Sequence, residues 1–509
     1  MTSQLQHREP GGRILSPTPT KNTRQNQHLS LIRFPKLSLI YFTSVCFILF
    51  LLFQIQSLHT TPKSPSWSLL RQFIITNNNN NNNNTLSFNP NCITPRQDQL
   101  ISSMIQKLRN SVTFLPLKDL RFADKPLQGH TWFMSSVYDT HEEEEVQYQQ
   151  FPSENSQGRL LCLKGKDTHD GSWNYYALAW PEALPLNATF VEGLTFVSYN
   201  HYNYDNLWHG LSAMVPFVAW HRMNHCHESP KRWVLYHWGE LRLKMGSWVR
   251  TLMGATFGED PKIEGFQGID FKKEQPVCFE KAVVMRHNEG GMSRQRRTEV
   301  FDLIRCKARE YCNITQELIL LSSSASASAP MIGLTLFMRT GARSFKNETE
   351  VIKIFKNECE KVDGCQLTIA YSNNLTVCQQ VKLMGMTDIL VSPHGAQLTN
   401  MFLMEKNSSV MEFFPKGWLK LAGVGQYVFH WLAGWAGMRH EGAWRDPDGE
   451  NCPYPDDDRR CMSIFKDGRI GYNQTLFAHW AKRVLNEVKL RKLEQASAST
   501  TITAPCSCA

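Results

Sequence analysis

The stretch at 388–415 holds the residues whose types and spacing point most directly to chemistry. His394, Gly395 and Ala396 follow a short apolar run, so we expect them to form the turn at the carboxyl end of a buried strand. Gly395 and Ala396 have almost no side chain, so a phosphate group can approach their backbone, and residues 397–403 can begin a helix whose free N–H groups favour an anion. The pattern therefore predicts a binding site for a nucleoside diphosphate.

Two arginines and one acid are placed where they would complete such a site. Arg339 and Arg343 follow a predicted strand at 332–338, and guanidinium groups bind phosphate oxygens in a bidentate manner. The alternative is that both are ordinary surface charges. Glu412 lies at the end of a neighbouring predicted strand, where an acid can bind a pair of ribose hydroxyls. The alternative for Glu412 is a strand residue that faces solvent.

Four polar side chains in this region have two possible roles each. His394 either donates a hydrogen bond to a phosphate oxygen or caps the strand as a structural histidine. Thr399 and Asn400 either hold the loop or contact the phosphates. Asn347 either caps the predicted helix that follows the arginines or carries a glycan, and we expect the cap.

Two motifs in this region resemble those of glycosyltransferase family 61. The first is His-Gly-Ala-x-Leu-Thr-Asn, which begins at His394 and is followed by a hydrophobic strand with a Glu before a Pro. The second is Arg…Arg-x-x-x-Asn-Glu, between Arg339 and Glu348. The resemblance covers roughly residues 190–480 and implies a two-lobed fold of the GT-B type. Plant members are Golgi enzymes that add xylose, arabinose or related sugars to cell-wall polysaccharides or N-glycans, and members elsewhere use UDP-N-acetylglucosamine on protein O-glycans.

Transfer to an acceptor hydroxyl also needs a general base. The polar and aromatic cluster at 201–209 leads into an apolar helix and resembles the family's Asn/aromatic-x-x-His segment. His209 or Asp205 is the candidate base for inversion at the anomeric carbon, with a pKa tuned towards neutrality. The alternative for His209 is a core histidine satisfied by hydrogen bonds.

The run Asp456-Asp457-Asp458 invites a metal-binding interpretation. GT-B sites neutralise the diphosphate with arginines and helix ends, and runs of acids are commonly solvated loops. We therefore expect no metal or other cofactor to be required, with a UDP-sugar as the donor substrate.

The elements that must position these residues are those of a doubly wound parallel sheet, whose ligands bind at the carboxyl ends of its strands. The lobe at 331–492 is predicted to contain strands at 332–338, 366–371, 388–391 and 410–414 and helices at 348–362 and 377–384.

A first α/β lobe is predicted at 92–321, followed by a Ser/Ala-rich linker at 322–330. A helix at 475–490 is expected to cross back to this first lobe, and residues 493–509 to be disordered. The fold is therefore predicted to be α/β and two-lobed, of the GT-B type with Rossmann-like sheets. Within the first lobe we expect strands near 195–197, 233–236 and 282–285 and a helix at 207–220.

The N-terminal region predicts a membrane anchor. Residues 1–36 are polar and basic, residues 37–53 are an uncharged apolar run just long enough to cross a bilayer, and residues 54–91 are a polar stem with an Asn tract. An uncleaved signal anchor with a cytosolic N-terminus fits better than a cleaved signal peptide, because the apolar run is long and no convincing cleavage site follows it.

Composition agrees with a globular protein of the secretory pathway. The 509 residues are 42% hydrophobic, and the net charge of +9 is too modest at this length to indicate a nucleic-acid partner. The 14 cysteines are scattered without zinc spacing, so we expect disulfides. Candidate N-glycosylation sites after the apolar run, besides Asn83 and Asn347, are Asn187, Asn313, Asn374, Asn407 and Asn473.

These features predict a single-pass type II Golgi enzyme with a lumenal catalytic domain. It would be an inverting glycosyltransferase that moves a sugar, a pentose such as xylose or arabinose, from a UDP-sugar to a cell-wall polysaccharide or glycoprotein glycan. The expected partners are the UDP-sugar, the glycan acceptor and the Golgi membrane, with no nucleic acid. The alternative is a membrane-tethered, catalytically inactive glycan-binding protein of the same fold. A hydrolase has no support, because no Gly-x-Ser-x-Gly elbow is present.

Overall fold

The first 94 residues and several internal segments are not part of this description, which rests on a computed structural model. The predicted basic tail, membrane anchor and stem, and all of the predicted linker except Pro330, lie outside the described residues. None of the helices in the described residues is both long and apolar enough to span a bilayer. The structure describes residues 95–117, 148–165, 174–200, 203–236, 243–266, 275–285, 292–314, 330–418, 423–449, 451–454 and 458–497, together with Cys506 and Cys508.

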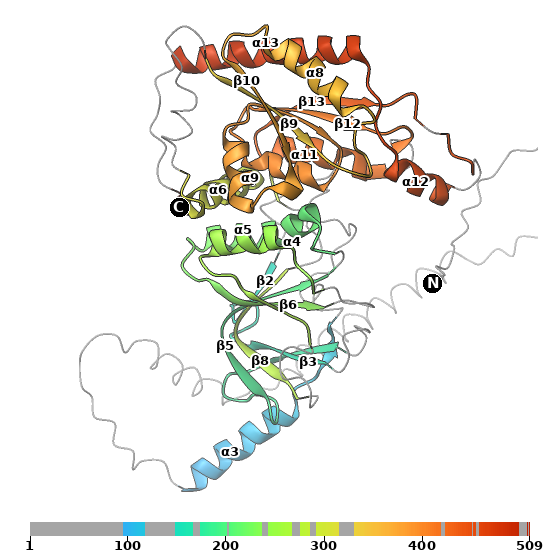
Figure 1. The fold of residues 1–509 in the computed structure, drawn as a ribbon. Coiled ribbons are helices and arrows are strands. Elements are labelled where there is room, and N and C mark those ends of the chain that lie inside the picture. The colour runs from blue at the N-terminus through green and yellow to red at the C-terminus, as the bar shows by residue number, and fades with distance from the viewer. Residues whose placement is uncertain are drawn as a thin grey trace, which may run out of the picture. The chain divides into compact units, whose positions relative to one another are not determined.

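The first sheet has a parallel half, in which crossover helices join the strands (Figure 1). Its apolar strands pair side by side, and α4 (Leu207–Met223) and α5 (Ser247–Phe257) lie between them in the chain, as parallel pairing requires. The predicted strands and the predicted helix at 207–220 are confirmed here. The parallel strands are β5 (Thr189–Tyr199), β6 (Pro230–Tyr236), β7 (Lys262–Glu264) and β8 (Val277–Met285).

The other half of the first sheet is antiparallel, so the sheet is mixed and the prediction of a doubly wound sheet is wrong for this half of the chain. The sequence interpretation missed these strands, because they are short and β3 and β4 are buried along most of their length without a clean alternation. The helix α3 (Pro95–Asn110) precedes them. The antiparallel strands are β1 (Leu115–Pro116), β2 (Tyr148–Phe151), β3 (Leu160–Gly165) and β4 (Asn174–Ala179).

The second sheet is parallel throughout and confirms the predicted doubly wound arrangement. Its spatial order is β10-β9-β11-β12-β13, which is 2-1-3-4-5 in chain order. The order reverses between β9 and β11, and ligands of such sheets bind in the crevice outside the carboxyl ends at that point. The strands are β9 (Ile332–Met338), β10 (Cys365–Tyr371), β11 (Ile389–Pro393), β12 (Ser409–Phe414) and β13 (Arg439–Arg445).

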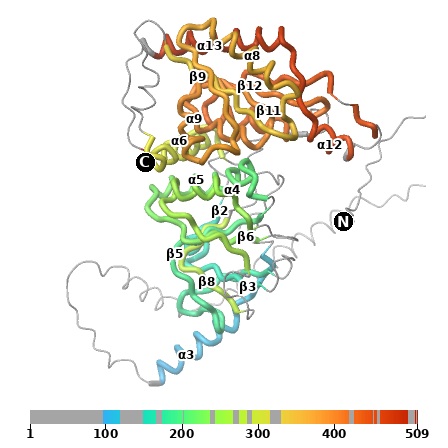
Figure 2. The backbone as a smooth tube through the Cα atoms, in the orientation of Figure 1, coloured from blue at the N-terminus to red at the C-terminus, as the bar shows by residue number. Residues whose placement is uncertain are grey.

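Helices cover both faces of the second sheet (Figures 1 and 2). On one face α8 (Glu348–Cys359) and α13 (Gln474–Ser497) pack against each other and against alternate strand residues. On the other face lie α9 (Val377–Gly385), the 3-10 helix η7 (Ala396–Leu403) and α11 (Val428–Trp435). Two core layers result, because side chains alternate across each strand.

A single apolar cluster joins the helices of the first half to those on the inner face of the second sheet, and residues 93–509 belong to one compact unit. It includes side chains of α4, α5 and α6 (Arg294–Tyr311) together with those of η7, α9 and α11. Trp248 of α5 donates its Nε1–H to Asn400 Oδ1 of η7 at 3.0 Å. Each fully buried large side chain such as Phe402 contributes about 1.5–3 kcal/mol, so this junction is a core rather than a loose contact.

The C-terminal segment differs from its prediction in two respects. The buried side chains of α13, such as Phe477 and Leu485, belong to the second sheet's core, so this helix does not cross to the first sheet. The tail predicted to be disordered from residue 493 continues α13 to Ser497, and Cys506 and Cys508 form disulfides. Composition gives no indication of such cross-links.

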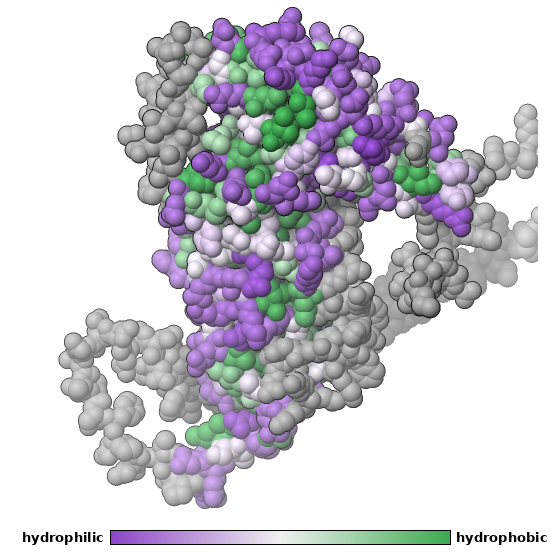
Figure 3. All heavy atoms as spheres, in the orientation of Figure 1, coloured by the Kyte–Doolittle hydropathy of each residue, from purple (hydrophilic) through white to green (hydrophobic). Residues whose placement is uncertain are grey.

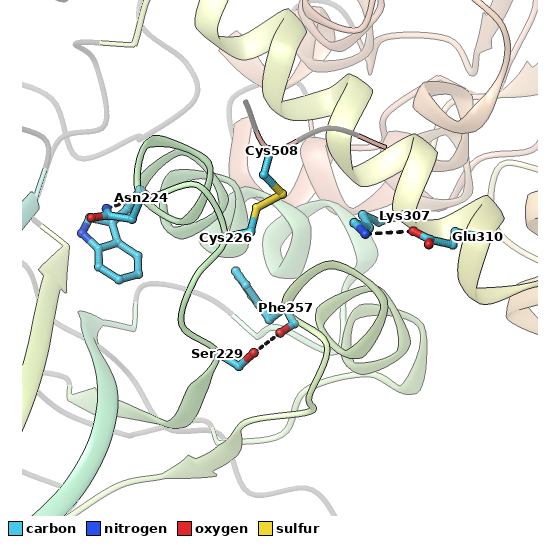
Figure 4. The surroundings of a disulfide bond; sticks show 8 residues. Asn224, Cys226, Ser229, Phe257, Lys307, Glu310 and Cys508 are labelled. Atoms are coloured by element: carbon cyan, nitrogen blue, oxygen red, sulfur yellow. Dashed lines mark hydrogen bonds and ion pairs between the residues drawn. A yellow bond between two sulfur atoms is a disulfide. The ribbon is translucent and has the colours of Figure 1, made fainter. Parts of the chain in front are cut away.

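Disulfides return the tail to the helices of the first half. Cys508 bonds to Cys226, in the turn after α4, and Figure 4 shows this bond near the end of α5, where Ser229 donates a hydrogen bond to the carbonyl of Phe257. The predicted disulfide chemistry is confirmed for the twelve cysteines described. Their pairs are Cys162–Cys278, Cys226–Cys508, Cys306–Cys506, Cys312–Cys378, Cys359–Cys365 and Cys452–Cys461.

The surface contrasts with these interiors. On the face that Figure 3 shows, hydrophilic side chains predominate over α8 and α13, and the apolar ones form separate patches. Apolar side chains of the described strands therefore go mainly into the cores, as expected for a globular domain of this composition.

Candidate active site

Arg339 and Arg343 lie in the loop after β9, at the switch point of the second sheet. The Arg339 Nη1–H points to His394 O at 3.3 Å, at the end of the adjacent strand β11. A Cβ at Gly395 would lie 2.2 Å from Arg339 Nη1, so glycine is needed for this approach. Arg343 has a φ of +60°, a strained backbone conformation for a residue other than glycine, and its N–H is held by Gly468 O at 3.1 Å. The topology thus brings together the arginine loop and the His394 turn, as predicted.

Several N–H donors at this point have no acceptor among the described residues. They are Arg339 Nε, Arg343 Nε and the indole Nε1 of Trp418, whose side chain is only 5% exposed. The Arg343 guanidinium lies over the Trp418 ring, 5.2 Å from its centroid. Because buried donors are normally paired, this group of unpaired donors indicates a site for an acceptor-rich ligand.

The electrostatics of the arginines favour an anion. Burial lowers the pKa of Arg339, and burial together with the charge of Arg339 lowers the pKa of Arg343 to about 10. Asp467, at the end of α12 (Asp458–Asp467), raises both pKa values, but it forms no ion pair with either guanidinium in the described part of the chain. Both arginines stay charged at neutral pH. Their half-buried positions exclude the alternative of ordinary surface charges.

His394 is buried, with 5% of its surface exposed, and is enclosed by aromatic rings. Its ring stacks on Phe414 at a centroid distance of 4.5 Å and lies 4.9 Å from Trp418 and 5.2 Å from Phe429. Its backbone N–H donates to Phe413 O at 2.8 Å. These contacts fix the orientation of the ring. One of the contacting residues, Trp418, also packs against the guanidinium of Arg343.

Glu412 is fully buried between two histidines. His394 Nδ1 lies 2.5 Å from Glu412 Oε1, and His440 Nε2 lies 2.8 Å from Glu412 Oε2. Burial by itself raises the pKa of Glu412, but the hydrogen bonds from the histidines outweigh burial and hold this pKa below its ordinary value. The solvent-facing alternative is therefore wrong. The predicted ribose contact gains no support, because the carboxylate is fully buried and each of its oxygens faces a histidine.

Residues 181–411 match the family model described as Glycosyltransferase 61. The chain therefore contains a domain of glycosyltransferase family 61. The match includes Asp205, His209, Arg339, Arg343 and His394 and ends just before Glu412, so it is shorter at its C-terminal end than the resemblance in the sequence suggested. No curated protein matches the chain. Membership makes the chain a glycosyltransferase, with a sugar donor and a glycan acceptor as its substrates.

Thr399 and Asn400 of the family 61 motif lie inside the protein. Both are fully buried in η7, the short helix predicted after the His394 turn. The amide of Asn400 accepts from Trp248 and donates to Gln397 O at 3.0 Å, so it holds the loop and the junction to α5. Thr399 Oγ1 has no partner within the described residues. The loop-holding alternative is favoured for Asn400 over phosphate contact.

The two candidate bases of this glycosyltransferase lie in different environments. His209 is half-buried in the first turns of α4, and burial and, to a smaller extent, the charge of Lys466 lower its pKa to about 4. Its neighbour Trp208 packs on Phe429, which also contacts His394. His209 is therefore neutral at pH 7 and can accept a proton, but its pKa lies well below the value near neutrality that was predicted for the base.

Asp205 is exposed and paired. Its Oδ2 lies 2.7 Å from Lys244 Nζ, and the two side chains are 39% and 76% exposed. Such an exposed ion pair is weak in water, and it leaves the carboxylate at the surface, whereas His209 is half-buried. The geometry therefore favours His209 over Asp205.

Two residues of the site were missed in the sequence. Trp418 follows the Glu-Phe-Phe-Pro segment, and its position three residues after Pro415 was the only available signal. His440 lies in β13, a strand with a half-exposed pattern that has little apolar character, so periodicity gave no indication of it.

The remaining site predictions concern metal and glycans. The Asp456 run is only partly described, and no group of three or more potential metal ligands occurs in the described ranges. Asn347 caps α8, accepting from Glu350 N at 3.3 Å, which confirms the predicted cap.

A cavity of about 520 Å³ lies on the first sheet and does not include the residues of the candidate site; it is lined by Asn187, Arg109 and Lys164 among others. Asn83 lies outside the described residues, and the remaining candidate glycosylation sites are exposed: Asn187, Asn313, Asn374, Asn407 and Asn473.

Proposed function

We propose that this family 61 protein is an inverting Golgi transferase that moves a pentose, xylose or arabinose, from a UDP-sugar to a cell-wall polysaccharide or glycoprotein glycan. The observation that carries the proposal is the set of N–H donors without acceptors at Arg339, Arg343 and Trp418. A diphosphate would supply the missing acceptor oxygens, and its negative charge would balance the two guanidinium groups.

The chemistry follows from this placement. The oxygen of an acceptor hydroxyl attacks the anomeric carbon on the face opposite the diphosphate, and the bond from that carbon to the diphosphate oxygen breaks. UDP leaves with the electron pair, and Arg339 and Arg343 stabilise the charge that develops on it. A base on the acceptor side takes the hydroxyl proton, and His209 is the base that we favour, with Asp205 as the second candidate.

The proposed architecture is that of a two-lobed GT-B transferase, with the donor on the second sheet and the acceptor on the first. The doubly wound second sheet and its switch-point arginines support the donor side of this assignment. The mixed first sheet supplies α4 with His209. Neither a metal nor another cofactor enters this proposal, because the arginines provide the positive charge.

The proposed location is the Golgi membrane, with the catalytic part in the lumen. The six disulfides among the described cysteines favour an oxidising compartment. Exposed sequons and the apolar run at 37–53 agree with a type II anchor.

Thermal unfolding of the full-length protein in detergent with a panel of UDP-sugars tests the donor. We expect UDP and a UDP-pentose to raise the melting temperature, since a ligand at 100 times its Kd stabilises by about 2.7 kcal/mol. UDP-N-acetylglucosamine is the comparison donor. If neither UDP nor any UDP-sugar stabilises the protein while a glycan does, the inactive glycan-binding alternative holds.

A turnover assay then tests the base. His209→Ala is expected to lower kcat by about 10²- to 10⁴-fold, as for other general bases, with little change in the KM for the donor. Asp205→Asn is the matched comparison and is expected to stay within a few-fold of the unmodified enzyme. The reverse result would move the role of base to Asp205.

A further inference from the structure

One ring nitrogen of His394 is hydrogen-bonded within the protein, and the other is not. Nδ1 lies 2.5 Å from Glu412 Oε1, whereas Nε2 has no hydrogen-bond partner in the part of the chain that the structure describes. A carboxylate only accepts hydrogen bonds, so the proton on a neutral His394 lies on Nδ1. Nε2 then carries a lone pair, and in this state it repels a phosphate oxygen instead of binding it.

The groups around His394 decide its charge. Burial lowers the pKa of His394, and the charges of Arg343 and Arg339 lower it as well, which together outweigh the hydrogen bond to Glu412 that raises it. His394 is therefore neutral in the free protein near pH 7. The charged and titratable groups that face this unit are Glu412 on β12, His440 on β13, His430 on α11, Arg339 and Arg343 after β9, and Asp467 on α12 through the arginines.

A bound diphosphate changes this balance. It neutralises the two arginines that oppose protonation and places negative charge beside the ring, while the buried Glu412 carboxylate remains on the other nitrogen. Two anions on opposite sides of an imidazole favour the imidazolium form.

We propose that the donor site takes up a proton together with its nucleoside diphosphate: His394 becomes an imidazolium whose Nε2–H donates to a phosphate oxygen, and Glu412 holds its charge. This inference rests on the proposed function, because it requires the diphosphate to bind at Arg339 and Arg343. It also resolves how a neutral histidine beside two arginines serves an anion.

His440 is a positioning residue in this unit, because it touches Glu412 and not the ligand. Its Nε2 lies 2.8 Å from Glu412 Oε2, which fixes the carboxylate plane so that Oε1 meets His394. β13 places it by pairing His440 with Val410, on the same face of the sheet as Glu412. The register then shifts, with Gly442 at a φ of +107° in the bulge.

Calorimetric titration of the full-length protein with UDP tests the inference. Titrations at about pH 7.5 in two buffers of different ionisation enthalpy give the number of protons taken up, and the UDP phosphate, with a pKa of about 6, is already largely ionised there. We expect up to about one proton per UDP and a Kd that rises by as much as tenfold per pH unit above neutrality. UDP binding without proton uptake overturns the inference and leaves the donor site intact, whereas no UDP binding overturns the proposed function itself.

Variants identify the group that is protonated. Glu412→Gln, which keeps the shape but not the charge, is expected to bring proton uptake close to zero and to weaken UDP binding. His440→Phe is expected to give an intermediate uptake, and no further loss when combined with Glu412→Gln, because it acts only through that carboxylate. His430→Phe is the control: this exposed ring lies 5.1 Å from His440 without a bond to Glu412, so uptake should match the unmodified protein.

Equal effects of His440→Phe with and without Glu412 would show that His440 does not act through the carboxylate. Thermal unfolding of each variant shows whether it folds. If Glu412→Gln does not fold, the measurement on the unmodified protein still decides the inference, since proton uptake is either present or absent there.

Discussion

Arg305 in α6 and Arg343 after β9 are both withdrawn from water, but their guanidinium groups are bonded in opposite ways. Arg305 uses its Nε for Phe402 O at 2.7 Å, its Nη2 for Ala436 O at 2.7 Å and its Nη1 for Asp302 at 2.8 Å. The Nε of Arg343 has no acceptor within the described residues, and its guanidinium faces the Trp418 ring.

The difference separates structure from function. Arg305 joins α6 to the ends of η7 and α11, so the partners of its hydrogen bonds all lie within the junction between the two halves. Arg343 and its neighbour Arg339 remain short of acceptors at a switch point, where a ligand is expected. A buried arginine with a partner on each of its three nitrogens stabilises the fold, whereas two arginines with unused donors at the switch point of a sheet indicate a ligand.

The largest expected effect is on stability at the junction. Arg305→Ala leaves two carbonyls and Asp302 Oδ1 without the donor that Arg305 supplies, although Asp302 Oδ2 keeps Lys406, and breaking a buried charged network of this kind costs about 3–5 kcal/mol. Urea denaturation followed by circular dichroism measures the change in the free energy of unfolding. Arg483→Ala is the control, an exposed arginine paired with Glu487, for which about 0–1 kcal/mol is expected. An equally small effect at Arg305 would contradict the structural role.

The next largest effect is on activity, with little change in stability. Arg343→Ala removes charge and unused donors, so we expect kcat/KM for the donor to fall by about 10²- to 10³-fold, the range for losing one transition-state donor. Unfolding should change by less than about 1 kcal/mol, because no internal hydrogen bond of the guanidinium is lost. Arg343→Lys, which keeps the charge but not the planar fork, should fall between. A large loss of stability in Arg343→Ala would show that this arginine stabilises the fold as Arg305 does, and would contradict the comparison.

The sequence predicted the second sheet much better than the first. The strands around 332–338 and 388–391 are short apolar runs separated by helices with clear periodicity, so local pattern and tertiary fold agree there. The antiparallel strands β3 and β4 have no such alternation, and their pairing is a long-range property. The return of the tail through Cys506 and Cys508 is likewise a matter of spatial proximity that spacing does not reveal.

The candidate site was predictable in its parts but not in its bonding. The types and spacing of Arg339, Arg343 and His394 indicated an anion site, and the topology places them together. The partners of Glu412 were not predictable, because His440 comes from a separate strand and reaches the carboxylate only through the pairing of β12 with β13.

The smallest expected effect tests the limit of the rule about unused donors and acceptors. Thr399 Oγ1 also lacks a partner, but its side chain is fully buried in η7, so it cannot reach a ligand without a rearrangement of that helix. Thr399→Val replaces the hydroxyl with a methyl of the same shape, and removing an unpaired buried polar group should be neutral or stabilise by up to about 1 kcal/mol. The melting temperature measures the effect on stability, and the Kd for UDP measures the effect on donor binding. A tenfold weaker Kd with unchanged stability would assign Thr399 to the donor site after all, and would show that η7 opens when the donor binds.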